Sequence, residues 1–212
     1  MEILKLENLS FSYGKKQVLS NVNYTFETGK IYAVVGKSGA GKTTLLSVIS
    51  GLAEPGSGTI YCKGEDLSKM DKYEYRSKNI GVIFQSFNLM TKLTAVENVE
   101  LSMEISGGKQ SDSKAKAYAL LEQVGLDRDE ADRRVLKLSG GQQQRVAIAR
   151  ALSYGPDIIL ADEPTGNLDE ETQAEIMDIL QGLARDGKCV IIVTHSSYVA
   201  SRADERIMLG KK

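Results

Sequence analysis

The sequence contains little of several residue types that mark other classes of protein. Among its 212 residues there are two cysteines, one histidine and no tryptophan. Cys62 and Cys189 stand inside apolar, strand-like runs with no second cysteine or histidine nearby at metal-ligand spacing. We therefore expect two reduced, buried thiols and neither a disulfide nor a zinc site, which is typical of a cytosolic protein.

The sequence also lacks an excess of charge of one sign and any long hydrophobic run. Its 27 Lys and Arg residues are balanced by 28 Asp and Glu residues, so a specific nucleic-acid partner is not expected. No apolar run approaches the roughly 18 residues of a membrane span. The first residues, 1–9, alternate apolar and polar side chains instead of forming a signal-peptide core. If the protein serves a membrane, we expect it to be peripheral, on the cytoplasmic face.

Strand patterns at the start of the chain predict an antiparallel part. Residues 3–6 and 18–26 alternate apolar and polar side chains, as strands with one buried face do. The denser apolar run at 31–35 is typical of a parallel strand that is buried on both faces. The patterns at 59–61 and 81–84 predict further strands.

The later part of the chain changes its periodicity twice. Residues 88–138 have helical periodicity and no convincing strand, which predicts a helical lobe. Apolar runs at 158–161 and 190–193 predict strands, and a helix is predicted between them from about 169 to 185. Strands that alternate with helices in this way form a parallel sheet with covered faces. The sequence therefore predicts an α/β fold.

A glycine-rich turn directly follows the strand predicted at 31–35 and precedes a helix predicted from Thr43. It fits the pattern G-x-x-x-x-G-K-[ST], in which backbone N–H groups surround phosphate oxygens and the helix N-terminus adds its positive dipole end. Lys42 can reach the β- and γ-phosphates, and the Thr43 hydroxyl can ligate Mg²⁺. A chance match arises roughly once in a hundred chains of this length. The predicted nucleotide contacts are Gly36, Lys37, Ser38, Gly39, Ala40, Gly41, Lys42, Thr43 and Thr44.

The phosphate-binding loop alone does not separate ATPases from GTPases and kinases, but two later segments do. Residues 138–145 read LSGGQQQR and resemble the signature sequence of ATP-binding cassette (ABC) ATPases. Residues 158–165 read IILADEPT and resemble the Walker B strand of the same family. The order and spacing of the three motifs match the family, and the resemblance covers essentially the whole chain. It implies an enzyme that hydrolyses ATP to ADP and phosphate with Mg²⁺.

The resemblance also implies how the chain is organised. We expect a single nucleotide-binding domain over residues 1–212, with a P-loop NTPase core formed by about 1–87 and 139–212. This core would hold a mainly parallel sheet and an N-terminal antiparallel β subdomain. An α-helical subdomain, about 88–138, would be inserted into it.

The signature segment can form a second site for an anion. Ser139 and the N–H groups of Gly140 and Gly141 precede a helix predicted over 142–152, whose dipole favours negative charge at its start. Taken alone, the segment could instead be a helix cap after a flexible turn. The resemblance implies that Ser139, Gly140, Gly141 and Gln142 face the γ-phosphate held by a partner chain. Two ATP molecules would then lie between two subunits, in a homodimer or a paired cassette.

Two neighbouring carboxylates follow the strand predicted at 158–161. Asp162 ends this buried strand, where a carboxylate is costly unless it meets a cation or donors, and Mg²⁺ reached through water is the natural partner. By resemblance, Glu163 is the general base that polarises the attacking water. The pair could instead lie in a solvated turn. Because glutamate stands at position 163, we expect a hydrolytically competent site.

Four further residues take their roles from the resemblance. His195, the only histidine, follows an apolar run at the carboxyl end of a predicted parallel strand, where α/β sheets bind ligands. It resembles the family's switch histidine, which contacts the γ-phosphate, and Gln85 resembles the Q-loop glutamine that touches Mg²⁺ and the water. Tyr13 resembles the aromatic residue that stacks on adenine, and Asp169 the D-loop aspartate at the dimer seam. Without the resemblance, His195 could be a structural residue, Gln85 a surface residue and Tyr13 a core residue. Asp169 could be the N-cap of the next helix, a role that it could combine with a place at the dimer seam.

The segment after Gln85 points to a branch of the family. Residues 86–90, SFNLM, and 165–169, TGNLD, look most like the branch that serves macrolide and peptide exporters and lipoprotein-release systems. In the family a membrane subunit docks beside the Q-loop, and an exposed cluster at residues 87–90 would suit that contact, although these residues could equally pack in the core of the helical lobe. Ser102 stands where the branch commonly has proline, and residues 134–137 lack the proline usual before the signature.

Three functions use this set of motifs. The first is the motor subunit of a transporter, the second a soluble ABC ATPase of translation or DNA repair, and the third a cassette that signals across a membrane without moving cargo. Translation-type members usually carry two cassettes in one chain, and repair-type members are interrupted by a long coiled coil. Since residues 88–138 contain no sustained heptads, the sequence favours the transporter subunit.

Overall fold

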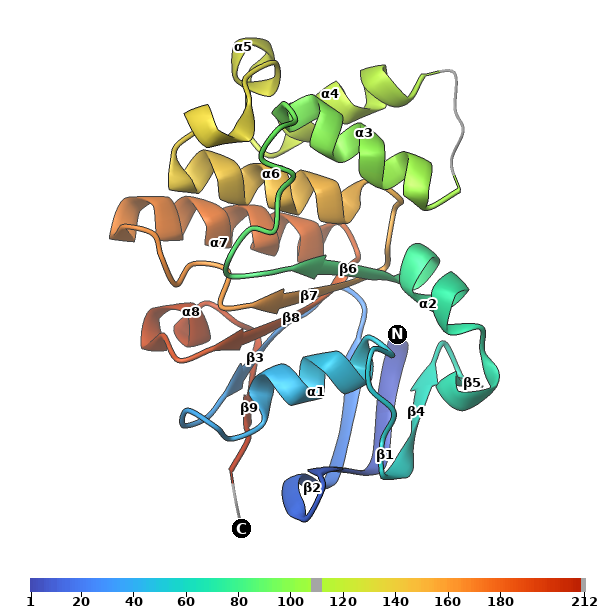
Figure 1. Ribbon diagram of the computed structural model, residues 1–212. Coiled ribbons are helices and arrows are strands. Elements are labelled where there is room, and N and C mark those ends of the chain that lie inside the picture. The colour runs from blue at the N-terminus through green and yellow to red at the C-terminus, as the bar shows by residue number, and fades with distance from the viewer. Residues whose placement is uncertain (108–111, 211–212) are drawn as a thin grey trace.

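Two β-sheets and a group of helices form the part of the chain that the computed structural model describes, residues 1–107 and 112–210 (Figure 1). One sheet is antiparallel, with the strand order β2-β1-β4-β5, and the other is parallel, with the order β6-β7-β8-β3-β9. The predicted α/β fold, with an antiparallel part at the N-terminus, is therefore confirmed. The antiparallel strands are β1 (Glu2–Tyr13), β2 (Lys16–Glu27), β4 (Ser57–Cys62) and β5 (Glu65–Asp66).

In the parallel sheet, β3, which leads into the phosphate-binding loop, lies next to β8, which leads to His195. Strand β8 pairs with β3 on one side and with β7 on the other. All six residues of β8 are buried, which explains why its sequence is a continuous apolar run. The parallel strands are β3 (Ile31–Val35), β6 (Ile80–Ile83), β7 (Ile158–Asp162), β8 (Cys189–Thr194) and β9 (Glu205–Met208).

Alternate residues of the central strand enter two different apolar cores. Ile191 and Val193 belong to a cluster shared with α1 and the antiparallel sheet, whereas Val190 and Ile192 belong to a cluster shared with α6 and α7. Figure 1 shows α1 on one face of the parallel sheet and α7 on the other. The helices beside the two sheets are α1 (Lys42–Ile49), the 3₁₀ turn η1 (Leu67–Lys69), α2 (Lys72–Asn79), α7 (Glu170–Arg185) and α8 (Ser197–Ser201).

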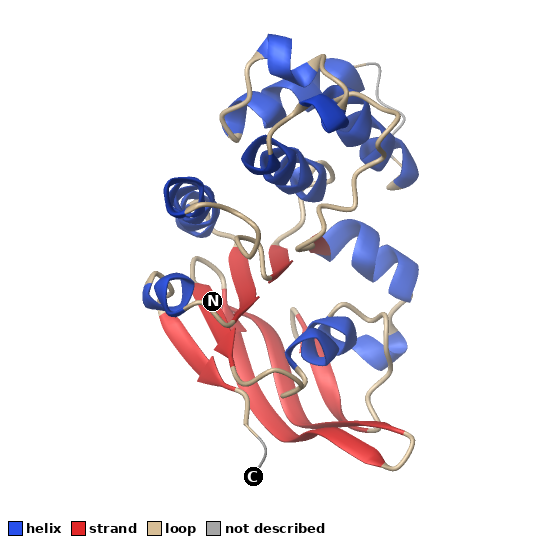
Figure 2. Ribbon diagram, turned by 60° about the vertical axis from the view of Figure 1, so that its left-hand side comes forward, coloured by secondary structure: helices blue, strands red, loops and turns tan. Residues whose placement is uncertain are grey.

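The remaining helices gather at the end of the molecule farthest from the antiparallel sheet (Figure 2). Between residues 88 and 138 the described residues form helices and one isolated bridge, from Thr94 to Arg134, and no strand. Thr94 and Glu97 form a reciprocal capping box at the start of α3. The helices between residues 88 and 138 are α3 (Ala95–Ile105), α4 (Ser113–Gln123), α5 (Arg128–Ala131) and the 3₁₀ turn η2 (Val135–Lys137). Helix α6 (Gly140–Leu152) follows them and packs against them.

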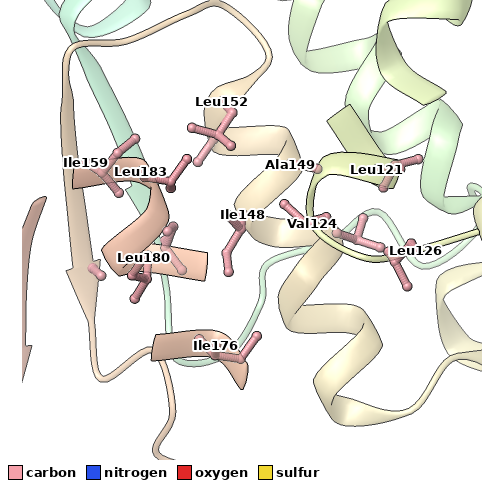
Figure 3. Packing of buried hydrophobic residues seen from close by; sticks show 14 of the residues in the cluster. Leu121, Val124, Leu126, Ile148, Ala149, Leu152, Ile159, Ile176, Leu180 and Leu183 are labelled. Atoms are coloured by element: carbon pink, nitrogen blue, oxygen red, sulfur yellow. The ribbon is translucent and has the colours of Figure 1, made fainter. Parts of the chain in front are cut away.

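Helix α6 joins this helical group to the parallel sheet (Figure 3). On one side, Ile148 and Leu152 face Leu180 of α7 and Ile159 of β7. On its other side α6 meets Leu121 and the end of α4. The helical group and the sheet therefore share one continuous apolar cluster, and α6 lies at its centre.

The structure corrects one predicted boundary that bears on the site. The signature helix begins at Gly140 and not at Gln142, so Gly140 and Gly141 lie inside its first turn. The reason is a capping box: Ser139 Oγ accepts from the Gln142 backbone N–H at 3.2 Å, and the Gln142 side chain accepts from the Ser139 N–H at 2.8 Å.

Both cysteines are free and buried, as predicted. Burial raises the pKa of the Cys62 thiol to about 11 and that of Cys189 to about 12. At neutral pH both thiols are therefore protonated and act as small apolar side chains. Among the described residues, no helix has the length and apolar character that crossing a membrane requires.

Candidate active site

A cleft of about 450 Å³ lies at the edge of the parallel sheet where β3, β7 and β8 end. The pairing register brings these ends together, because Val35 of β3 lies opposite Thr194 of β8 and Asp162 of β7 lies opposite Val193. Ligands of α/β sheets bind at this edge. The cleft is lined by Tyr13, Lys16, Val18, Ser38, Gly39, Gly41, Lys42, Thr43, Thr44, Gln85, Asp162, Glu163, Val193 and His195.

The phosphate loop leaves β3 and enters α1 through glycines that no larger residue could replace. A Cβ atom at Gly36 would overlap the carbonyl oxygen of Leu209. Gly41, the N-cap of α1, has a left-handed φ of 93°, and a Cβ there would lie 2.7 Å from Val18 Cγ1. Because Gly41 has no side chain to cap the helix, the N–H groups of its first turn are available to an anion.

Lys42 lies over the phosphate loop. Its Nζ donates a hydrogen bond to the Gly36 carbonyl at 2.8 Å and one to the Lys37 carbonyl at 3.4 Å. Gly36, Lys37 and Ala40 therefore belong to the same loop, although they do not line the cleft. The structure thus brings Lys42 and seven of the other eight predicted loop residues to one place. Five of these seven line the cleft, and the other two, Gly36 and Lys37, accept hydrogen bonds from Lys42.

Asp162 lies half-buried at the end of β7, facing the first turn of α1. Thr43 and Asp162 line the same cleft. Burial raises the pKa of Asp162, and the negative charge of Glu163 raises it further, whereas the Thr43 side chain and the charge of Lys42 lower it. A cation at this position would favour the ionised carboxylate, since it would compensate for the lost hydration.

Glu163 is held in the cleft through its backbone and through both of its carboxylate oxygens. Its φ of 47° is in the left-handed region, which is uncommon for a residue with a side chain, and its N–H donates to the Val193 carbonyl at 2.9 Å. One carboxylate oxygen, Oε1, lies 2.7 Å from Nδ1 of His195. The other, Oε2, accepts a hydrogen bond of 3.1 Å from the Thr194 hydroxyl. The Glu163 side chain is 14% exposed and that of His195 is 73% exposed.

Gln85 and Tyr13 approach the cleft from two other segments. Gln85 follows β6, and a Cβ at Gly166 would lie 3.0 Å from its amide Nε2, so the absence of a side chain at Gly166 makes room for this amide. Tyr13 ends β1 and is 60% exposed. Its ring is therefore open for stacking against a base, and it is not the core tyrosine that was the alternative.

The signature residues and Asp169 do not line this cleft. Ser139 caps α6, and Asp169 caps α7 by accepting from the Thr172 N–H at 2.9 Å, as the N-cap prediction required. The two helix starts touch, because a Cβ at Gly141 would lie only 2.5 Å from Thr172 Cγ2. The predicted contact of the signature with a nucleotide on a partner chain remains a prediction.

The sequence pattern missed four residues at or beside the cleft: Lys16, Val18, Val193 and Thr194. Lys16 and Val18 come from the start of β2, a strand remote in the sequence from the motifs. Thr194 did have a signal. It is a hydroxyl residue that ends a fully apolar strand, directly before the only histidine, and a buried hydroxyl needs a partner.

The comparison with protein families decides the identity of this fold and site. The sequence profile of the family described as "ABC transporter" matches residues 19–166, which is more than half of the chain. The chain belongs to the ABC transporter family. It is the ATP-binding cassette of that family, and it is an ATPase.

Relatives of this ABC cassette differ in what surrounds the shared region. The uncharacterized ABC transporter ATP-binding protein YclH of Bacillus subtilis (strain 168) is 42% identical over 214 residues, covering 100% of this chain and 95% of that protein. The macrolide export ATP-binding/permease protein MacB of Shewanella sp. (strain W3-18-1) is 45% identical over 203 residues. Those residues cover 93% of this chain and 31% of that protein.

Solved structures of one cassette, MJ0796, have the same fold. The dimeric structure of MJ0796, described as a bacterial ABC transporter cassette, is 39% identical and has a TM-score of 0.86, covering 98% of this chain and 94% of that one. The same values hold for a dimeric structure of a post-hydrolysis state of the ATP-binding cassette MJ0796 bound to ADP and Pi.

Proposed function

We propose that this ABC cassette is the ATP-hydrolysing subunit of a transporter, that two copies close around two ATP molecules, and that closure drives a separate membrane subunit of the export or lipoprotein-release type. The observation that carries the proposal is the position of Glu163. Its carboxylate lies in the cleft that the phosphate loop also lines, held between His195 and Thr194. A carboxylate held next to a triphosphate-binding loop suits the activation of water for phosphoryl transfer.

The nucleotide would bind through several separate contacts. Adenine would stack on Tyr13, and the phosphates would accept hydrogen bonds from the N–H groups at the start of α1. Lys42 would exchange its bonds to loop carbonyls for bonds to the β- and γ-phosphates. A base stacked on an aromatic ring contributes about 1–3 kcal/mol of binding free energy.

The residues in the cleft fit a magnesium ion. Mg²⁺ prefers oxygen ligands and is usually held by one or two protein groups together with waters and substrate phosphates. The Thr43 and Asp162 side chains provide such oxygens, with Gln85 on the same wall. No group of three or more His, Cys, Asp or Glu side chains suited to a metal occurs among the described residues, and this type of site does not need one. When bound, Mg²⁺ would neutralise charge on the phosphates.

Glu163 would act on the attacking water. The carboxylate accepts a proton from the water as its oxygen forms a bond to the γ-phosphorus, and the bond between that phosphorus and the bridging oxygen to the β-phosphate breaks. The products are ADP and phosphate, and the proton returns to solvent from Glu163. His195 would contact the γ-phosphate, and its exposed ring is free to make that movement.

Dimerisation is supported by the position of the signature. Ser139, Gly140, Gly141 and Gln142 form the first turn of α6 and its cap, away from the nucleotide cleft of the same chain. The capping box uses the Gln142 N–H, so the N–H groups of Gly140 and Gly141 are the ones that favour an anion brought by another molecule. The MJ0796 cassette, 39% identical, has been solved as a dimer. Asp169, which caps α7 beside the start of α6, would lie at the seam between the copies.

A groove of about 410 Å³ beside the Q-loop suits a membrane subunit. Leu52, which lines it, is 63% exposed, and Met90, two residues after the groove-lining Asn88, is 56% exposed, whereas Leu89 packs against the core. Large exposed apolar side chains next to a groove mark a binding surface. The 45% identity to MacB, which carries its permease in one protein, supports the export type. The subunit would then work as a peripheral protein at the inner surface of a bacterial membrane, with no specific nucleic-acid partner.

Replacing the carboxylate of Glu163 tests the proposal. Glu163→Gln keeps the size of the side chain but removes the base, so we expect ATP binding to persist while turnover falls by roughly 100-fold or more. The variant should also accumulate an ATP-bound dimer on gel filtration. Glu104→Gln, the same change on the exposed surface of α3, is the control and should turn over like the wild type. Wild-type turnover in Glu163→Gln would remove Glu163 from this role.

The membrane partner has its own test. Cross-linking the protein in its native cells, followed by identification of the chains recovered with it, should yield a membrane-spanning protein. Recovery with ribosomes or DNA alone would favour a soluble role in translation or repair.

A further inference from the structure

We propose that Thr194 is a positioning residue for the hydrolysis reaction, because its hydroxyl holds one oxygen of the Glu163 carboxylate in place while the other oxygen remains free to take the proton of water. This inference rests on the proposed role of Glu163 as general base. None of the family motifs identified in the sequence includes Thr194, which was only the last residue of an apolar strand.

The hydrogen bonds around Thr194 fix the direction of its hydroxyl. The backbone N–H of Ser196 donates to Thr194 Oγ1 at 3.0 Å, and Oγ1 lies 3.1 Å from Glu163 Oε2. A threonine hydroxyl has a single proton. Since an N–H group already donates to this oxygen, the proton points to Glu163, where an ionised carboxylate can only accept.

Burial makes this bond persistent. Thr194 is 1% exposed, at the end of the central strand β8, so water has little access to its hydroxyl. Hydrogen bonds to an ionised group are the strong ones, and a site shielded from water strengthens them further. The backbone of Glu163 is also fixed to the same strand, through its N–H bond to the Val193 carbonyl. Strand β8 therefore holds Glu163 at two points, the backbone and Oε2.

The two carboxylate oxygens have different partners. Oε2 is bonded to buried Thr194, whereas Oε1 is bonded to His195, whose side chain is 73% exposed. An exposed imidazole can turn toward a γ-phosphate, and a buried hydroxyl cannot leave its strand. When His195 turns, Oε1 becomes free to accept the proton of the attacking water, while Thr194 keeps the carboxylate plane in the same orientation. Thr194 thus acts through Glu163 and does not itself touch ATP.

Replacement of Thr194 tests this assignment through the separation of kcat from KM. Thr194→Val removes the hydroxyl at nearly constant size, so kcat should fall by roughly 10- to 100-fold, as expected for one lost bond to a charged group. KM for ATP should stay within about twofold of the wild type, because the phosphate contacts are untouched. Thr194→Ser keeps the hydroxyl and should recover most of the rate. Thr59→Val, on β4 outside the cleft, is the matched control.

A second pair of variants separates positioning from a general effect on the fold. In a Glu163→Ala background the carboxylate is absent, so adding Thr194→Val should lower the residual turnover by less than about twofold if Thr194 acts through Glu163. A 10- to 100-fold loss in that background would overturn the proposal, because the effect of Thr194 on turnover would then not depend on the Glu163 carboxylate. An unchanged kcat in Thr194→Val, together with a strongly reduced kcat in Glu163→Ala, would overturn this proposal and leave the proposed function intact. Wild-type turnover in Glu163→Ala would overturn both.

Discussion

Lys42 makes hydrogen bonds within the phosphate loop that a bound nucleotide would replace. Its Nζ donates to the carbonyl oxygens of Gly36 and Lys37, the first two residues of the phosphate loop after β3. These bonds keep the charged end of the side chain above the helix start, where the phosphates would lie. An ammonium group that is already oriented loses little side-chain entropy when a phosphate arrives.

Removing this charge tests the phosphate-loop assignment. In Lys42→Ala we expect the Kd for ATP to rise by roughly 100-fold or more, because one charge-assisted contact to two phosphates is lost. Isothermal titration calorimetry measures the change directly. Lys69→Ala, an exposed lysine outside the cleft, should bind ATP like the wild type. An unchanged affinity in Lys42→Ala would contradict the assignment.

Single residues differ in how far the sequence alone could predict them. The loop glycines, Lys42 and the Asp162–Glu163 pair stand in contiguous motifs with a chemical reason for each residue, and all lie at or beside one cleft. Thr194 depends on a pairing between the ends of β7 and β8, 31 positions apart in the sequence. The sequence marks Thr194 as a hydroxyl residue at the end of a buried strand, but only the structure shows that its partner is Glu163, because local periodicity does not contain a long-range hydrogen bond.

Among the elements, α6 connects the signature to the Q-loop. The Arg150 guanidinium, near the end of α6, donates to the Phe87 carbonyl at 3.0 Å and to the Asn88 carbonyl. Phe87 and Asn88 have left-handed φ values of 57° and 52°, which cost free energy in residues with side chains. Burial lowers the pKa of Arg150, whereas Tyr154 beside it raises this pKa. Arg150 therefore stabilises a strained turn just after Gln85.

Truncation of Arg150 tests this connection. Arg150→Ala leaves two carbonyl groups without their donor in a partly buried place, so the free energy of unfolding should fall by about 2–4 kcal/mol. Arg150→Lys should recover only part of the loss, since an ammonium group lacks the planar fork with which the guanidinium donates to both carbonyls. Denaturant titration provides the measurement. Equal stability of Arg150→Ala and the wild type would show that the turn does not depend on this side chain.

Elements with a clear apolar pattern were predicted, and those without one were not. Strands β3, β7 and β8 are short runs of mostly buried residues, and helix α7 buries one apolar face. Their residues match the predicted ranges within one or two positions. Helix α2 was missed because Tyr75 is its only buried residue, and β9 because its residues alternate between half-buried and exposed. Contacts with distant parts of the chain stabilise these two elements, and the local pattern of apolar residues does not reveal such contacts.

For the molecule as a whole, the cleft of one chain holds the residues proposed to hydrolyse ATP, whereas the signature and Asp169 lie outside it. The described residues place the phosphate loop, Glu163 and His195 together, while Ser139 caps a helix elsewhere. The helical group that carries the signature shares an apolar cluster with the sheet through α6. Any closure between two copies must therefore move the signature and the core together or deform that shared cluster.

The arrangement of the whole molecule was predicted more from the resemblance to the ABC family than from the pattern of apolar and polar residues. The α/β fold and the group of helices followed from periodicity, because both depend on local repeats of apolar residues. The pairing of two copies did not, since a single chain gives no pattern for an interface with itself. The exposed helix start at Ser139 is the one physical indication of it.

Disulfide cross-linking across the proposed dimer seam tests the central claim most directly. Ser38→Cys in the phosphate loop and Ser139→Cys in the signature would be combined with Glu163→Gln, and the native Cys62 and Cys189 are buried too deeply to interfere. With ATP and a mild oxidant we predict a covalent dimer, and with either cysteine alone or without ATP we predict monomer. Absence of that dimer in the ATP-loaded protein, with both cysteines shown to be reactive, would contradict the account.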